Sequence, residues 1–199
     1  MNYKFFMVPG ILVLLLTMVG SNLTAINIVK EKEIGTIEQI NVTPVKKYHF
    51  VLGKLIPFWC LGLVVFSIGG IIAWLVYGIV PVGSFFTIYF FAAVYLLAVL
   101  GLGLLISTYA NNQQQAMLIS FFIMMIFVLL SGLYTSIDSM PGWAKVITKL
   151  NPVSYFIEVI RMVVLKGSGV SDIKPQLLTI LGFAVVLNSC AVASYRKRS

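Results

Sequence analysis

Five long apolar runs, separated by short polar segments, constrain this chain of 199 residues more than any other feature of its sequence. A helix needs about 20 apolar residues to cross the hydrocarbon core of a bilayer, which is about 30 Å thick. Charged residues make up only 10% of the chain, whereas they make up about a quarter of a soluble domain. The sequence therefore predicts an all-α integral membrane protein with a single membrane domain. We expect five transmembrane helices, at about residues 8–28, 55–77, 85–109, 117–134 and 177–195.

The distribution of charged and reactive side chains excludes several classes of function. The bases behind the net charge of +8 lie in short loops and in the C-terminal tail, where Lys and Arg orient membrane proteins, so we expect no nucleic-acid binding. The predicted spans contain no ionisable acid, base or histidine, which argues against an ion-coupled carrier and a voltage sensor. The chain has no P-loop motif, no catalytic constellation and no metal-ligand spacing, so we expect no enzyme. Cys60 and Cys190 lie in apolar runs, where buried and inert thiols are expected.

The longest strongly polar segment of the chain, residues 30–54, lies between the first two predicted spans. It contains half of the acidic residues and the only histidine. Ile34, Ile37 and Ile40 recur at every third position among the charges, and Thr43-Pro44 ends this pattern. Two interpretations are open: a solvated cytoplasmic loop, or a short helix whose isoleucines dock in a groove on a soluble partner.

A second distinctive segment, residues 152–166, precedes the last predicted span. Asn151 followed by Pro152 is typical of a helix start, with Asn as the N-cap and Pro at the first helical position. Apolar residues follow at near-helical spacing, and Glu158 and Arg161 lie three positions apart, a spacing that allows an ion pair on the opposite face. The apolar run is too short to span a bilayer, so we expect an interfacial or re-entrant helix.

The positions of the basic residues predict the orientation of the chain. Five spans place the two termini on opposite sides of the membrane. The side that holds both residues 30–54 and the basic tail at residues 196–198 carries more Lys and Arg, close to the ends of spans. Because such bases favour the cytoplasm, the sequence predicts a multi-pass protein of the inner or plasma membrane, with its N-terminus outside and its C-terminus cytoplasmic.

Three motifs, in order along the chain, resemble those of permeases of the type-2 (exporter) ATP-binding-cassette, or ABC, superfamily. The polar segment is similar to the signature E-x-E-x-G-T-x-E, followed by T-P and G-K, at Glu31, Glu33, Gly35, Thr36, Glu38, Thr43-Pro44 and Gly53-Lys54. The start of the first span resembles F-x-x-P-G, here residues 6–10. The segment before the last span resembles N-P-x-x-Y-x-x-E-x-x-R, at Asn151, Pro152, Tyr155, Glu158 and Arg161.

The resemblance implies how such a chain works with its partners. In this family the polar loop forms a cytoplasmic coupling helix that is seated in a cleft of a separate ATPase subunit. Its motif implies that coupling to the ATPase involves Glu31, Glu33, Gly35, Thr36 and Glu38. The third motif implies an extracellular-side re-entrant segment that narrows the exit path, formed by Asn151, Pro152, Tyr155, Glu158 and Arg161. ATP and Mg²⁺ bind the ATPase subunit in this family, so no cofactor is expected on this chain. The family also implies that two permeases form a homo- or heterodimer.

The resemblance further implies ATP-driven efflux of small amphiphilic, drug-like compounds from the cytoplasm. Export of a lipid or a lipid-linked glycan is one alternative, and a non-transporting membrane assembly or anchoring protein is another. Permeases of this family usually begin with one more span and often a large extracytoplasmic domain, and this chain begins where that domain would end. A fragment, a shortened gene product and a half that works with another polypeptide are therefore all open.

Overall fold

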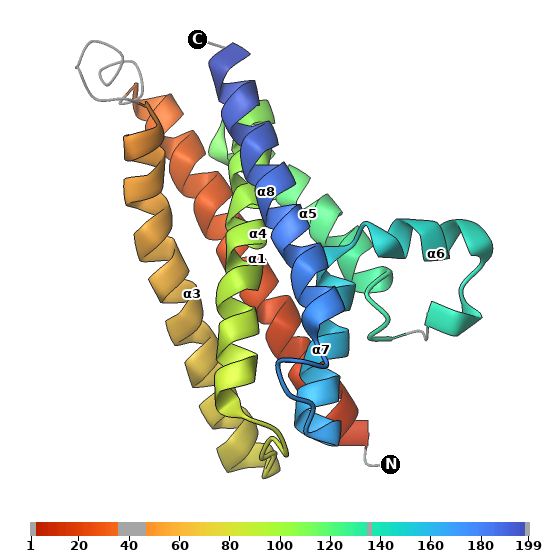
Figure 1. The fold of residues 1–199 in the computed structure, drawn as a ribbon. Helices are drawn as coiled ribbons and strands as arrows, with labels where there is room; N and C mark the ends of the chain where they lie inside the picture. Colours follow the sequence, from red (N-terminus) through yellow and green to blue (C-terminus); the bar gives the residue numbers. More distant parts are fainter. Residues whose placement is uncertain (1–2, 36–46, 135–136, 198–199) are drawn as a thin grey trace.

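The computed structural model describes residues 3–35, 47–134 and 137–197, and Figure 1 shows them as a bundle of long helices. The helices are α1 (Tyr3–Ile34), α3 (Lys47–Tyr77), α4 (Phe85–Tyr109), α5 (Gln113–Leu129), α6 (Gly142–Lys149), α7 (Pro152–Lys166) and α8 (Lys174–Lys197), with a 3₁₀ turn at Ile137–Ser139. The part of the chain that the structure describes contains no strand. The predicted all-α class is therefore confirmed.

Four of the described helices are long and apolar enough to cross a membrane, over Phe5–Ile34, Gly53–Tyr77, Phe85–Tyr109 and Lys174–Ser194. The remaining predicted span, at about residues 117–134, corresponds to α5, which has 17 residues and is therefore about 25 Å long. It ends at Leu129 and not at residue 134, because the chain turns at Gly132, whose φ of 76° is left-handed. The count of five spans stays a prediction.

The first helix continues past the predicted end of its span at residue 28. It ends in four charged residues and Ile34, and Figure 1 shows this end of α1 beside the start of α3 and the end of α4. Gly35 ends the helix with a φ of 79°, and its N–H donates to the Lys32 carbonyl over 3.1 Å. A glycine in this left-handed conformation is a common helix stop. The polar segment is therefore helical at its start, up to Ile34.

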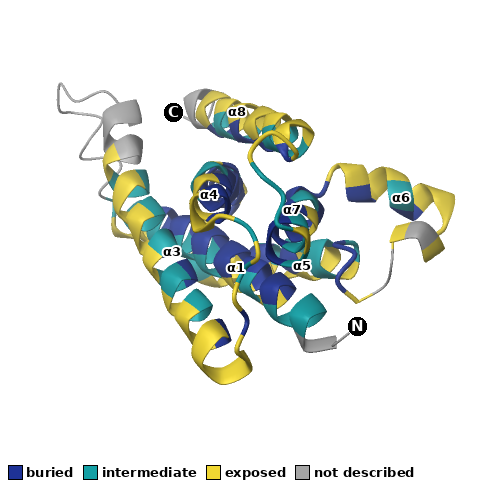
Figure 2. Cartoon of the chain, turned by 60° about the horizontal axis from the view of Figure 1, so that its bottom comes forward, coloured by how far each residue is buried: buried dark blue, intermediate teal, exposed yellow. Residues whose placement is uncertain are grey.

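Helix α4 lies at the centre of the bundle, with α1, α3 and α8 around it in Figure 2. In its most apolar window 72% of the residues are buried, against 11% for α3 and 17% for α8. Two glycines allow this close packing. A Cβ on Gly103 would lie 2.6 Å from the Ser21 carbonyl oxygen of α1, and one on Gly101 would lie 2.6 Å from the Asn188 amide nitrogen of α8.

Helix α7 is inserted in the bundle and packs against α1 and α4. Its Phe156 is fully buried, with ring centroids 5.2 Å from Phe91 and 4.8 Å from Tyr95 of α4. Asn151 caps its start and Gly167, with a φ of 70°, ends it. This burial distinguishes α7 from a helix that lies on a membrane surface, and its re-entrant course stays a prediction.

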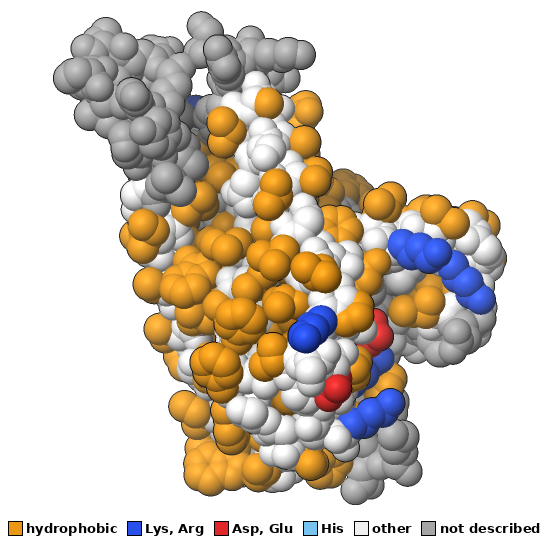
Figure 3. Space-filling model, viewed as in Figure 1, with side chains coloured by type: hydrophobic (Ala, Val, Ile, Leu, Met, Phe, Trp, Pro, Cys, Tyr) orange, Lys and Arg blue, Asp and Glu red, His pale blue; other side chains and the backbone are white. Residues whose placement is uncertain are grey.

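The two cysteines differ from the expectation of buried thiols. Cys60 of α3 and Cys190 of α8 are both exposed on the outside of the bundle. Hydrophobic side chains cover much of the face shown in Figure 3, as suits helices that contact lipid. An apolar run indicates a membrane span but not which of its residues face lipid and which face other helices. The expectation was therefore wrong for both thiols.

Candidate functional site

The end of α1 carries four consecutive charged residues, at positions 30–33, where the apolar run stops. Three of them contact three different elements of the bundle. Glu31 binds α3, Lys32 binds the last turn of α4, and Glu33 binds the first turn of α5. The adjoining residues 36–46 lie outside the described part of the chain. We call the three residues at positions 31–33 the charged end of α1.

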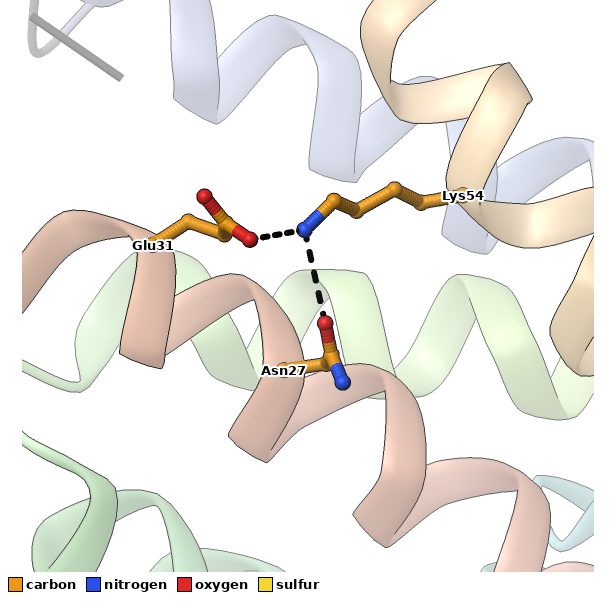
Figure 4. A network of polar contacts seen from close by, with 3 residues as sticks. All are labelled: Asn27, Glu31 and Lys54. Atoms are coloured by element: carbon orange, nitrogen blue, oxygen red, sulfur yellow. Dashed lines mark hydrogen bonds and ion pairs between the residues drawn. The ribbon is translucent and has the colours of Figure 1, made fainter. Parts of the chain in front are cut away.

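Glu31 and Lys54 form an ion pair between α1 and α3, on the two sides of the polar loop (Figure 4). Lys54 Nζ also lies 3.4 Å from Oδ1 of Asn27, one turn before Glu31 on the same face of α1. Both charged side chains are 22% exposed, so water screens this pair less than it screens a pair on the surface. The pair holds together the two helices that lead into and out of residues 36–46.

Lys32 binds the C-terminal end of α4. Its Nζ donates to the carbonyl oxygen of Ser107 and, over 3.4 Å, to that of Ala110. The last carbonyls of a helix have no partner within the helix, and together they carry a partial negative charge. The ammonium group of a lysine donates hydrogen bonds to these carbonyls and places a positive charge beside them. Helix α4 thereby gains a basic group at its end, although its own last turn contains none.

Glu33 binds the N-terminal end of α5. One carboxylate oxygen accepts from the backbone N–H of Gln113 over 3.0 Å, and the other accepts from the Gln113 side-chain amide over 2.5 Å. The first N–H groups of a helix lack partners and carry a partial positive charge, which an acidic group stabilises. Asn112, the N-cap, accepts from the Gln115 N–H over 2.7 Å. Glu33 and Asn112 thus satisfy two of the free N–H groups of α5.

The structure brings together some of the residues that the first motif singles out. Glu31 and Glu33 both lie at the charged end of α1 and bind groups of their own chain, and Gly35 ends the helix. Thr36 and Glu38 lie outside the described residues. The predicted coupling role of these five positions stays a prediction.

Sequence reasoning singled out Lys54, the partner of Glu31, as part of the G-K pair of the motif. It did not single out Lys32 or Gln113, which also take part in the contacts at this end of the bundle. The alternation of acid and base just after an apolar run was a usable signal. So was the uncharged polar turn at residues 110–115, which provides free carbonyl and N–H groups.

The residues of the third motif lie along α7 and bind neighbouring elements. Asn151 accepts from the Val153 N–H over 3.0 Å as the N-cap, and its amide donates over 2.8 Å to the Phe127 carbonyl of α5. Pro152 holds the first helical position, where a missing N–H costs little. The Tyr155 hydroxyl donates over 3.0 Å to the carbonyl of Lys149, the last residue of α6. The start of α7 is therefore joined to the ends of α5 and α6.

The ion pair that the spacing allows between Glu158 and Arg161 does not form. Glu158 accepts from the Gln176 amide of α8 over 3.0 Å. The Arg161 guanidinium carbon lies 3.5 Å from the ring centroid of Phe6 in α1, and its Nη1 donates over 3.2 Å to the Gly132 carbonyl. The spacing of three residues allowed an ion pair, but each of the two side chains binds partners outside α7 instead. Nε and Nη2 of Arg161 are buried without a hydrogen-bond partner in the protein.

These contacts connect helices of the bundle. Within residues 3–35, 47–134 and 137–197, no group of three His, Cys, Asp or Glu side chains is placed to hold a metal ion. The pattern of the family described as ABC-2 family transporter protein matches residues 1–193.

The chain belongs to this family.

Named relatives of this ABC-2 permease are transport proteins. It is 30% identical over 198 residues to the probable multidrug ABC transporter permease YbhR of Escherichia coli (strain K12), covering 100% of this chain and 54% of that protein. It is 31% identical over 164 residues to the probable multidrug ABC transporter permease YbhS of the same strain, covering 82% and 44%. With the inner membrane transport permease YhhJ, also of that strain, it shares 27% identity over 186 residues, covering 92% and 49%. The chain thus spans about half the length of these relatives, and the predicted family of ABC transporter permeases is confirmed.

Proposed function

We propose that this chain is the transmembrane permease subunit of an ATP-driven ABC exporter, which moves small amphiphilic compounds out of the cytoplasm with a separate ATPase subunit. The family and the names of the relatives support an ABC permease. One observation supports the coupling role most directly. Just before residues 36–46 of the polar segment, three consecutive charged residues of α1 bind α3, α4 and α5, so a force on residues 36–46 reaches most of the bundle.

The proposed orientation places the charged end of α1 on the cytoplasmic side. In Figure 1 the end of α1, the turn between α4 and α5 and the C-terminus lie at the same end of the bundle, and the N-terminus lies at the opposite end. Helix α8 ends at Lys197, at this end of the bundle as well. A concentration of Lys and Arg at one end supports a cytoplasmic location for it. The ATPase would then meet the loop from the same side.

The proposal is tested by purifying the tagged chain from detergent-solubilised membranes of the cells that express it. We expect a P-loop ATPase to co-purify in stoichiometric amount. In proteoliposomes the complex should move a fluorescent amphiphile such as ethidium in an ATP-dependent way. Lipid export is indicated if lipids, and not the amphiphile, stimulate ATP hydrolysis. The absence of any ATPase would contradict the proposal and favour an assembly or anchoring protein.

A matched pair of glycine variants tests the role of the end of α1. A Cβ would meet no atom within 4 Å at either Gly35 or Gly70, but only Gly35 has a left-handed φ, of 79°. An alanine in that conformation costs about 1–2 kcal/mol, so Gly35→Ala should deform the exit from α1. We expect Gly35→Ala to retain insertion but to lose most ATP-dependent transport. Gly70→Ala, inside α3, should transport as the parent does, and equal transport by both variants would contradict the coupling role.

A further inference from the structure

We propose that Lys32 and Glu33 act as a clamp on the turn between α4 and α5, so that α5 transmits movement of the polar loop to the start of α7. This inference rests on the proposed function, because an ATPase must move the loop. It adds which residues of the chain carry that movement into the bundle. The turn consists of residues 110–112, between the end of α4 at Tyr109 and the start of α5 at Gln113.

The order of the two charges matches the polarity of the two helix ends. The end of α4 presents carbonyl oxygens with a partial negative charge, and the start of α5 presents N–H groups with a partial positive charge. Lys32 reaches the carbonyls of Ser107 and Ala110, and Glu33 reaches the N–H of Gln113. A lysine followed by a glutamate therefore attracts both ends. The reverse order would repel both.

Helix α5 is suited to carry a displacement from this clamp. Glu33 holds its start, and near its end the Phe127 carbonyl accepts over 2.8 Å from Asn151, the N-cap of α7. Just past its end, the Gly132 carbonyl accepts from Arg161 of α7. Of its 17 residues only Ala116, Ser120 and Met124 are buried, at every fourth position, so α5 packs on the bundle, chiefly on α1, along one face and is exposed on the other. Movement at one end is therefore delivered to the other.

The clamp lies where it can be altered without disturbing the core. Glu33 is exposed and Lys32 is half-buried, at the polar end of the bundle. Exchanging the two residues, as Lys32→Glu with Glu33→Lys, keeps the composition and net charge of the chain. It places an acid beside the carbonyls of α4 and a base beside the N–H groups of α5. The exchange therefore tests the order of the charges and not merely their presence.

The experiment uses the chain bound to its ATPase in detergent, with Cys60 and Cys190 replaced by alanine. A reporter thiol is introduced as Leu150→Cys, at an exposed position beside Asn151. Its rate of reaction with a maleimide is compared without nucleotide and with ATP and vanadate. We expect the rate in the parent to change about fivefold or more, as is typical of coupled sites. The exchange variant should lose this change while it still binds the ATPase.

A matched control separates the clamp from the loss of any carboxylate. Asp172, in the connection between α7 and α8, accepts from the Gly169 N–H over 2.9 Å, much as Glu33 accepts from the Gln113 N–H. Asp172→Asn should keep the full response of the reporter, whereas Glu33→Gln should reduce it. If the exchange variant does not insert, Glu33→Gln carries the test. A full response of the reporter in the exchange variant would overturn the clamp. Where Glu33→Gln carries the test, a full response in that variant would do the same. Loss of ATPase binding in the tested variant would also overturn the clamp.

A second measurement tests the clamp independently of the ATPase. Spin labels are placed at two exposed positions on either side of it, as Ile34→Cys and Asn111→Cys. The clamp predicts one narrow distribution of label distances in the parent and a clearly broader one in the exchange variant. Equal widths would overturn the clamp. If no ATPase binds the parent chain, the proposed function fails, and this distance measurement still decides whether the clamp exists.

Discussion

The charged end of α1 and the helix α7 each join several elements of the bundle, but they do so with opposite chemistry. At the end of α1, charged side chains bind helix ends in a region that is partly open to water. Along α7, a buried aromatic side chain, Phe156, packs against rings of α3 and α4. Ionic contacts near water are individually weak, whereas buried packing is sensitive to small changes of shape. The first region is suited to be remade during a cycle, and the second to hold its shape.

We therefore expect variants in the two regions to affect different properties of the protein. Variants along α7 should change the free energy of unfolding of the bundle. Variants at the charged end of α1 should change the link between ATP hydrolysis and transport while the bundle stays folded.

The largest effect is expected for Phe156→Ala. Phe156 is fully buried, and its ring centroid lies 4.8 Å from that of Tyr95 and 5.2 Å from that of Phe91. Removing the ring leaves a cavity and should lower the free energy of unfolding by about 3 kcal/mol. Thermal unfolding of the detergent-purified chain measures this. Phe121→Ala, on the exposed side of α5, is the matched control and should have little effect; similar losses for both variants would mean that α7 does not anchor the core.

Much of the fold could be predicted from the sequence, because a long apolar run has few alternatives to a membrane helix. The positions of the spans on α3, α4 and α8 follow from hydropathy alone. The end of α1 does not, because the helix is prolonged by partners that lie far away in the sequence, such as Gln113. The exposure of Cys60 and Cys190 was missed for another reason. Hydropathy does not tell which face of a span meets lipid.

The candidate site was predicted as a set of motifs but not as a set of contacts. The motifs singled out Glu31, Glu33 and Arg161, and each binds another element of the bundle. The partner of Arg161 was not predicted, because helical spacing considers only neighbours on the same helix. Phe6 is separated from it by most of the chain. A pairing of that kind requires the three-dimensional arrangement.

A smaller effect is expected for the contact between Arg161 and Phe6, which ties α7 to the start of α1. The guanidinium carbon lies 3.5 Å from the ring centroid, a close cation–π geometry. In a double-mutant cycle with Arg161→Met and Phe6→Leu, we expect a coupling energy of about 1 kcal/mol. The free energies of unfolding of the four proteins give this value. Additive single effects would show that the two side chains are neighbours without a favourable interaction.

The smallest effect on stability is expected for the ion pair between Glu31 and Lys54, although it closes the polar loop. The cycle of Glu31→Gln and Lys54→Met should give a coupling energy of about 0.5 kcal/mol, in the range of partly exposed pairs. The value should fall further in 1 M salt, where the screening length is about 3 Å.

Transport should be more sensitive to this ion pair than stability is. Because the pair fixes α3 to α1 beside the loop, each single variant should lower the amount of substrate moved per ATP more than Phe121→Ala does. If the pair instead proves as important for stability as Phe156, the end of α1 is a structural anchor like α7. The distinction between a region that moves and a region that holds its shape would then have no basis in this bundle.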